Sequence, residues 1–394
     1  MNNHIRNLFA TILIFIFISG CATTPDVKQA PVFYPEAPAL PRIQFLTSFT
    51  SSLDIEPEKS ALDQFIVGGK QTIIRLDKPY GVAIHDGKIY VCDTNQTVVV
   101  IDLNKKTFGP LAGAQGRGKL LQPINISIDK AGNKYVADPI KQQVAAYDKN
   151  DFYVRSYELN RDWKPVDAVT YEDKLYVADI KNKEVQVFSL ATGELTQSFG
   201  QQGEPKDKLA LPTNLAFDSE GFLYVADTGR FQIIKLDRDG NVRGTIGQLG
   251  NQLGFFARPR GIALDRENRL YAVDAAFDNV QIFTKEGQLL FFFGRAGQTP
   301  GDLYLPAKVA VDYQNIEYFK RYADPSFEIE ALILVTSQFG NFMVNVYGLG
   351  KEKGKKYPTE EELRKIAEEK VKKKENPEQK QESPGKKDAG EKKE

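Results

Sequence analysis

Leu223-Tyr224-Val225-Ala226-Asp227 is the most regular copy of a five-residue stretch that occurs five times along the chain. Each copy places a tyrosine beside small or apolar residues and ends in an aspartate. The five aspartates are 45, 41, 48 and 47 residues apart, at Asp93, Asp138, Asp179, Asp227 and Asp274. A period of about 40–50 residues is typical of propellers and other repeat arrays.

A proline and a short apolar strand precede each copy, and a sixth such start follows the last copy. The six prolines are Pro79, Pro123, Pro165, Pro212, Pro259 and Pro306. Another alternating strand follows each aspartate, as at Val185–Phe188, and a fourth often ends in Phe-Gly, as at Phe199-Gly200. Four short strands joined by Gly, Asp and Asn turns form one antiparallel sheet. Six starts therefore predict an all-β fold, a six-bladed β-propeller.

This order of residues resembles the NHL repeat, which runs from a proline and glycine through Leu-Tyr-Val-Ala-Asp to a terminal Phe-Gly. The resemblance covers roughly residues 76 to 348, and it is most complete at 211–247 and 257–294. It implies the propeller fold. It implies nothing about chemistry, because one fold hosts many activities.

The ring of blades must close, since open blades leave unpaired strand edges. The sixth repeat offers only three strands, at 308–312, 331–336 and 342–347. The segment Ile43–Phe49 is similar to the fourth strand at Leu195–Phe199, so we predict that an N-terminal strand closes the last blade. The alternative is that this segment is only an apolar linker.

The N-terminal residues resemble a lipoprotein export signal. Arg6 precedes an apolar run, Leu8–Ile18, which is shorter than the about 20 residues of a membrane span. Ile18-Ser19-Gly20-Cys21 resembles a lipobox, which implies acylation of Cys21 and attachment to a membrane; the alternative is an ordinary secretory signal or an uncleaved anchor. Ala22 is not the aspartate associated with inner-membrane retention, so the resemblance favours the outer membrane of a bacterial envelope.

The chain thus divides into a signal (1–20), a proline-rich linker after Cys21 (21–41), the propeller (42–350) and a charged tail (351–394). We expect most of the tail to be disordered, because Lys and Glu dominate it and it has little apolar surface to bury. Cys92 occupies a slot that holds small apolar residues in the sister repeats, so we expect it to be a buried small side chain.

Composition excludes several functions. Lys and Arg total 52, as do Asp and Glu, and a formal net charge of zero disfavours nucleic-acid binding. With two histidines in the chain, a metal centre built on several imidazoles is excluded. We expect no cofactor, no metal and no catalytic residue. The tyrosine and aspartate repeated in every blade are expected to serve packing and turns.

The strongest candidates for a ligand site follow the six prolines, where inner strands begin around the propeller axis. Tyr80 and Arg260 come directly after a proline. One residue further on stand Asn125, Asp167, Asn214 and Lys308, which we expect at the mouth of the central channel.

A second candidate is the insertion within the sixth repeat, residues 313–330. Its aromatic and cationic side chains form either a helical lid that binds a partner or a cover for the blade edges; they are Tyr318, Phe319, Lys320, Arg321, Tyr322 and Phe327.

The leading functional hypothesis is a monomeric, non-enzymatic envelope module that binds a protein or glycan partner, such as an exported or redox assembly. The alternative is a hydrolytic enzyme of lactonase or lyase type that uses the channel mouth.

Overall fold

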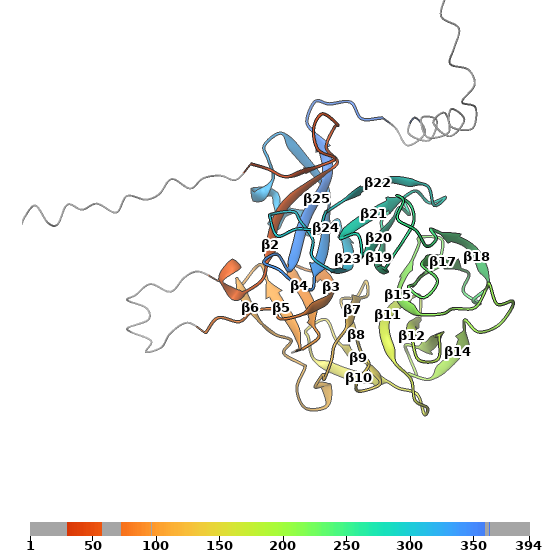
Figure 1. Ribbon diagram of the computed structural model, residues 1–394. Coiled ribbons are helices and arrows are strands. Elements are labelled where there is room, and N and C mark those ends of the chain that lie inside the picture. The colour runs from red at the N-terminus through yellow and green to blue at the C-terminus, as the bar shows by residue number, and fades with distance from the viewer. Residues whose placement is uncertain (1–29, 57–71, 96, 359–361, 363–394) are drawn as a thin grey trace, which may run out of the picture. The chain divides into compact units, whose positions relative to one another are not determined.

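The computed structural model describes residues 30–56, 72–95, 97–358 and 362. From Val32 onward these residues form six antiparallel sheets around a common centre (Figure 1). The all-β, six-bladed propeller is confirmed. Cys21 and almost all of the tail lie outside the described residues. Within the described part of the chain, no helix has the length and apolar character needed to cross a membrane.

Five blades each use four consecutive strands. The first three contain β3 (Pro79–His85), β4 (Lys88–Asp93), β5 (Val98–Asp102) and β6 (Thr107–Pro110); β7 (Asn125–Ile128), β8 (Lys134–Asp138), β9 (Gln143–Tyr147) and β10 (Tyr153–Tyr157); and β11 (Pro165–Tyr171), β12 (Lys174–Asp179), β13 (Glu184–Ser189) and β14 (Leu195–Phe199). The next two contain β15 (Pro212–Phe217), β16 (Leu223–Asp227), β17 (Gln232–Leu236) and β18 (Val242–Ile246); and β19 (Pro259–Leu264), β20 (Leu270–Asp274), β21 (Asn279–Phe283) and β22 (Leu289–Phe293).

The sixth blade joins both ends of the domain, as predicted. Its strands, from the centre outward, are β23 (Pro306–Asp312), β24 (Phe327–Ser337), β25 (Val344–Glu352), β2 (Ile43–Phe49) and β1 (Phe33–Tyr34). In the pairing of β2 with β25, Ile43 lies opposite Leu349 and Phe49 opposite Val344. The sheet thus begins at Phe33, nine residues before the expected start at 42, and ends at Glu352. The inner strands contact one another in the order β3, β7, β11, β15, β19, β23 and back to β3, so the ring is closed.

The repeated aspartate holds each blade's turns together. The Asp138 carboxylate accepts hydrogen bonds from the backbone N–H groups of Leu121 (2.6 Å) and Gln122, just before Pro123, and of Ile140 and Lys141 in the turn after it. Asp227 does the same in the fourth blade, where Ala210 N–H lies 2.7 Å from its Oδ2. The expected structural role of the aspartate is confirmed.

The repeated tyrosine packs between neighbouring blades, also as expected. Tyr176 of the third blade is 1% exposed and belongs to one apolar cluster with Leu215 and Val225 of the fourth. Tyr271 of the fifth blade packs with Val309 and Ile333 of the sixth. Cys92 is fully buried among apolar residues, and burial raises the pKa of its thiol well above the usual value. It is a small core residue.

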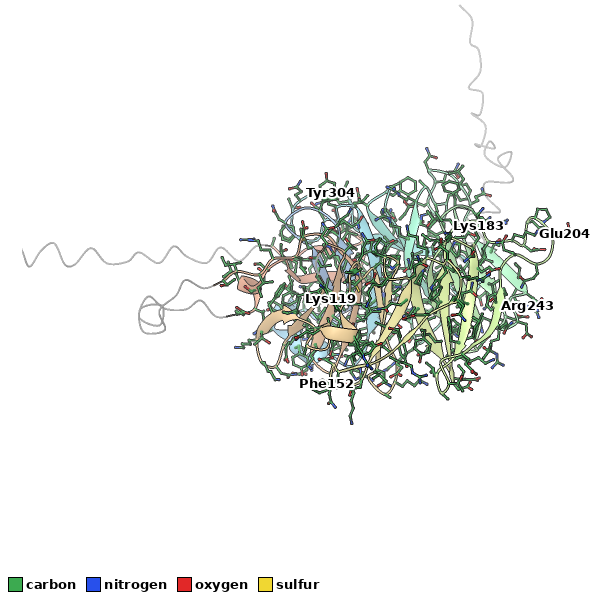
Figure 2. All side chains as sticks on the ribbon, turned by 90° about the horizontal axis from the view of Figure 1, so that it is seen from below. Lys119, Phe152, Lys183, Glu204, Arg243 and Tyr304 are labelled. Carbon is green, nitrogen blue, oxygen red and sulfur yellow. The ribbon has the colours of Figure 1, made fainter. Side chains whose placement is uncertain are left out.

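Strand direction gives the propeller two different faces. The connections before each proline and the turns after each repeated aspartate lie on one face, which we call the proline face. The turns that join the first to the second strand of a blade, and the third to the fourth, lie on the opposite face. Figure 2 shows Tyr304, from a connection on the proline face, and Phe152, from a turn of the second blade, on opposite sides of the domain.

Candidate functional site

Three of the predicted channel residues meet at the propeller axis. The Lys308 ammonium donates to Asn214 Oδ1 at 2.7 Å and to Asp167 Oδ2 at 3.1 Å. The three side chains come from β23, β15 and β11, and all are buried. Sequence placed them at equivalent positions of three blades, two residues after the proline, and the ring brings them together.

The electrostatics of this cluster are those of a buried ion pair. Burial raises the pKa of the Asp167 carboxyl, while the Lys308 ammonium and the backbone N–H groups of Leu215 and Ala168 oppose the rise. Leu215 N–H donates to Asp167 Oδ2 at 2.9 Å and Ala168 N–H to its Oδ1 at 3.0 Å. The carboxylate is thus fully engaged by protein donors, and the axis carries a neutral pair.

Glycine allows the inner strands to approach one another at two of the six equivalent positions. A Cβ atom on Gly81 would lie 2.6 Å from Asn125 Cα, and one on Gly261 would lie 2.4 Å from Lys308 Cα. The Asn125 amide N–H donates to the Val166 carbonyl at 2.8 Å, so Asn125 bridges the second and third blades. Two buried amide atoms around the axis, Asn125 Oδ1 and Asn214 Nδ2, have no hydrogen-bond partner among the residues that the structure describes.

The other two predicted residues, Tyr80 and Arg260, meet at the proline-face end of the axis. The Arg260 guanidinium carbon lies 5.6 Å from the centroid of the Tyr80 ring, and its Nη1 donates to Gln338 Oε1 at 2.8 Å. Partial burial and neighbouring Arg258 lower the pKa of Arg260, although Tyr80 opposes this. Burial raises the pKa of the Tyr80 phenol, so its O–H remains a donor at neutral pH.

The sequence analysis did not identify Gln338 and Thr336, which form hydrogen bonds with the residues at this end of the axis. Thr336 accepts from the Lys308 backbone N–H at 3.1 Å and donates to the Tyr80 carbonyl, tying the sixth blade to the first. Both residues flank Ser337, which replaces the repeated aspartate. That departure from the repeat was the available signal for a specialised position.

The insertion of the sixth repeat covers the junction with the first blade. It contains two 3-10 turns, η4 (Ile316–Tyr318) and η5 (Lys320–Tyr322), where a longer helix was one of our alternatives. Asn315 Oδ1 accepts from the Gly87 backbone N–H at 2.8 Å, and the Tyr318 hydroxyl donates to Asn104 Oδ1 at 2.7 Å. These contacts support the interpretation as a cover for blade edges.

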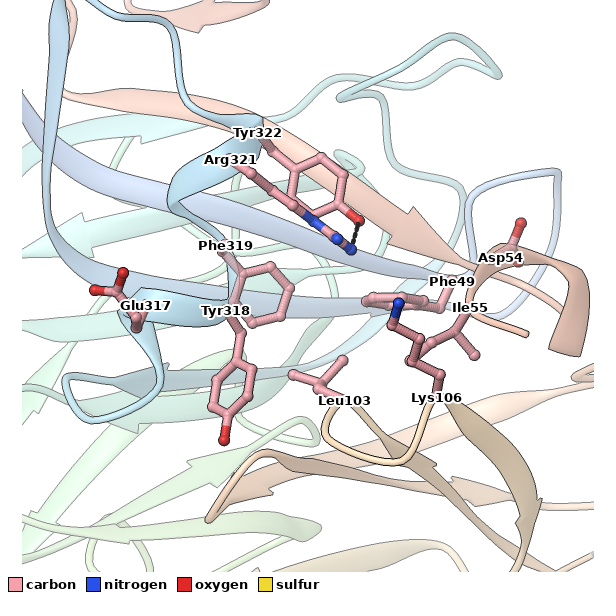
Figure 3. A pocket seen from close by; sticks show the side chains of 10 residues that line it. All are labelled: Phe49, Asp54, Ile55, Leu103, Lys106, Glu317, Tyr318, Phe319, Arg321 and Tyr322. Carbon is pink, nitrogen blue, oxygen red and sulfur yellow. Dashed lines mark hydrogen bonds between the residues drawn. The ribbon is translucent and has the colours of Figure 1, made fainter. Parts of the chain in front are cut away.

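Three aromatic side chains of the insertion, Tyr318, Phe319 and Tyr322, line a pocket of about 440 Å³ beside Phe49 (Figure 3). Phe319 is 1% and Phe327 3% exposed, so these two are core residues and do not present a surface to a partner. Tyr318 and Tyr322 are half-buried, and the Tyr322 hydroxyl accepts from Arg321 at 2.6 Å. Of the six predicted partner-loop residues, only Lys320 and Arg321 are exposed.

Among the described residues, no group of three or more His, Cys, Asp or Glu side chains is arranged to hold a metal ion. The polar side chains at the axis are instead organised around Lys308.

Fold and axis together define a six-bladed β-propeller whose centre holds a buried lysine–aspartate pair. No family model matches the chain. Solved structures share the fold at low identity. A Bacteroides thetaiotaomicron protein of unknown function is 16% identical with a TM-score of 0.53, over 69% of this chain and 70% of that one.

A gluconolactonase from Xanthomonas campestris is 15% identical with a TM-score of 0.50, and the match covers 69% of this chain and 86% of that one. Virginiamycin B lyase from Staphylococcus aureus is 14% identical with a TM-score of 0.46, over 73% and 86% of the two chains. At such identities the likeness concerns the fold alone.

Proposed function

We propose that this chain is a lipid-anchored protein of the bacterial cell envelope, whose NHL-type propeller binds a protein or glycan partner through its proline face. The anchor would be Cys21, in the lipobox-like sequence, with the outer membrane as the favoured location. The folded domain would serve as a monomeric, non-enzymatic binding module.

The distribution of exposed apolar side chains carries this proposal. Eight of the thirteen exposed large hydrophobic residues among those described stand in connections and turns of the proline face: Leu53, Ile73, Leu121, Ile140, Leu249, Leu253, Tyr304 and Phe339. Single exposed apolar residues are ordinary, but the placement of most of them on one face supports that face as the binding surface.

The alternative, a lactonase or lyase activity at the axis, has less support. Calcium in proteins takes six to eight oxygen ligands. Here Asp167 Oδ2 and Asn214 Oδ1, the ligands that such an ion would use, already accept from the Lys308 ammonium. A lysine cation at this position repels a second cation, so the axis favours the non-enzymatic function.

Photocrosslinking in the producing bacterium tests the proposal. A photoreactive amino acid replaces Ile140, which is 57% exposed on the proline face, or Phe152, which is 63% exposed on the opposite face. We expect a discrete crosslinked species from position 140 and none from position 152. Equal crosslinking from both positions, or none from position 140, would contradict a binding role for the proline face.

A further inference from the structure

The proline-face end of the axis contains more side-chain hydrogen-bond donors than the described residues supply with acceptors. Arg260 forms no ion pair with any carboxylate of the described residues, and its one side-chain hydrogen bond within them goes to Gln338 Oε1. Gln338 is 5% exposed, and its side-chain NH₂ group, which donates no hydrogen bond within the described residues, is a further donor. In the described part of the chain the Tyr80 hydroxyl also makes no hydrogen bond.

These three side chains come from three successive blades. Arg260 belongs to β19 of the fifth, Gln338 follows β24 of the sixth, and Tyr80 belongs to β3 of the first. The hydrogen bond to Gln338 and the stacking on Tyr80 hold the guanidinium in place. A fixed, planar guanidinium is suited to binding a carboxylate or phosphate through two parallel hydrogen bonds.

The local charge favours a single negative charge at this point. Arg258 is the nearby cation that most affects Arg260, and Asp167, the carboxylate that most affects Tyr80, is paired with Lys308 at 3.1 Å. A partly buried guanidinium without a counterion gains more from an anion than one in water, because the local dielectric constant is lower.

Two exposed aromatic side chains come from the chain segments that adjoin Gln338. Phe339 directly follows Gln338, is 44% exposed, and packs against Tyr304, which is 45% exposed, with ring centroids 5.9 Å apart. Backbone bonds fix this pair to the same end of the sixth blade, since Gln338 N–H donates to the Leu305 carbonyl at 3.2 Å. A donor set next to exposed aromatic rings fits a ligand group with a carboxylate and a neighbouring apolar side chain.

We propose that Arg260, Gln338 and Tyr80 bind a carboxylate of a peptide segment of the partner, and that Tyr304 and Phe339 contact an apolar side chain beside that carboxylate. This inference rests on the proposed function, because it specifies the chemistry of the partner that covers the proline face. Acidic peptide segments with aromatic or aliphatic neighbours are the recognised class.

Ligand-observed NMR with the full detergent-solubilised protein tests the inference. The probe is an acetylated, amidated pentapeptide of glycine, phenylalanine, aspartate, phenylalanine and glycine, and its matched partner has asparagine in place of aspartate. We expect the aspartate peptide to bind at least about tenfold more tightly, since a charge-assisted bidentate pair is worth more than about 1.4 kcal/mol. Phenylacetate and inorganic phosphate serve as further probes.

Two variants assign the binding to this site. Arg260→Met should abolish the preference for aspartate. Arg266→Met is the matched control, because Arg266 also stacks on a tyrosine, with its guanidinium carbon 4.2 Å from the Tyr313 centroid, but lies in a turn of the opposite face. It should bind the peptide as the unmodified protein does.

Equal affinity for the two peptides, or an aspartate preference that survives Arg260→Met, would overturn the inference. Arg260-dependent binding of phosphate or phenylacetate without binding of the peptide would also overturn it, in favour of a small-anion site. Crosslinking from position 140 that persists in Arg260→Met would leave the proposed function standing in each of these cases.

Discussion

At the residue scale, the position two residues after each proline has one of two structural roles, depending on the blade. Glycine at 81 and 261 lets neighbouring strands approach, while polar residues at 125, 167, 214 and 308 fill the centre. A buried ammonium is costly unless it is paired and hydrogen-bonded. Lys308 meets this condition because Asp167 and Asn214 both accept from it.

Removing the ammonium should therefore destabilise the domain. Lys308→Met leaves the Asp167 carboxylate buried without its counterion, and we expect a loss of about 3–5 kcal/mol in the free energy of unfolding at pH 7. Denaturant titration followed by circular dichroism measures it. The double variant Asp167→Asn/Lys308→Met, which has no uncompensated charge, should recover at least half of the loss.

The stability of the Lys308→Met protein should also depend on pH, and the direction of this dependence can be predicted. Burial already raises the pKa of Asp167, and without Lys308 the pKa rises further. An acid whose folded-state pKa is raised binds protons more tightly when folded, so the Lys308→Met protein should lose stability as pH rises from about 4 towards 7. The double variant should lack this component. A Lys308→Met protein with unchanged stability across that range would show that the pair is dispensable.

Residue-level reasoning from the sequence identified the axis residues but not their chemistry. Equivalent positions in a repeat must meet at the centre of a closed ring, so Asp167, Asn214 and Lys308 followed from the spacing of the prolines. Which donor pairs with which acceptor depends on side-chain reach across the axis. Gln338 was not predicted as a site residue, because the sixth repeat departs from the pattern at Ser337. The hydrogen-bond partner of Arg260 could therefore not be predicted either.

At the element scale, the sixth blade lacks the repeated aspartate, and other side chains accept the hydrogen bonds that the aspartate accepts in the other blades. Ser337 replaces the repeated aspartate, and its hydroxyl accepts from the Tyr304 backbone N–H at 3.2 Å, while Asp278 of the fifth blade accepts from Leu305 N–H at 2.7 Å. Two side chains thus perform the role that one aspartate performs elsewhere. Closure by β2 was predictable because the sixth repeat lacks a fourth strand and Ile43–Phe49 is similar to Leu195–Phe199. Strand β1 was not predictable, because Phe33–Tyr34 lies in a proline-rich segment without a visible period.

Closure by β2 can be tested with two matched phenylalanines on outer strands. Phe49 of β2 is 2% exposed and lies against Phe319 at a centroid distance of 6.5 Å, whereas Phe292 of β22 is 40% exposed. Phe49→Ala should cost about 3–5 kcal/mol, because it removes a large buried side chain from the junction between the sixth and first blades. Phe292→Ala should change stability by less than about 0.5 kcal/mol.

Thermal unfolding followed by circular dichroism measures both variants. Equal midpoints for Phe49→Ala and the unmodified protein would mean that β2 contributes little to ring closure. The insertion participates in the same junction, so truncating Phe319, the partner of Phe49, should produce a loss that is not additive with Phe49→Ala.

At the scale of the whole molecule, the first described strand and the proposed binding face occupy different parts of the domain. The described chain enters the sheet at β1, on the outer edge of the sixth blade, and the exposed apolar residues of the proline face stand in the connections. Localisation and partner binding should therefore be separable by mutation.

Cys21→Ser should release the protein from the membrane without unfolding it. Each buried methylene of an acyl chain contributes about 0.8 kcal/mol, so losing the whole anchor removes the dominant membrane affinity. After cell fractionation, we expect the variant in the soluble fraction and the unmodified protein in the membrane pellet. The thermal midpoint of the variant should stay unchanged, because Cys21 precedes the first strand at Phe33. Cys92→Ala is the matched control: alanine occupies the equivalent buried slot at Ala137, Ala178 and Ala226, so this variant should stay in the pellet. A Cys21→Ser protein that remained there too would require an anchor other than a lipid on Cys21.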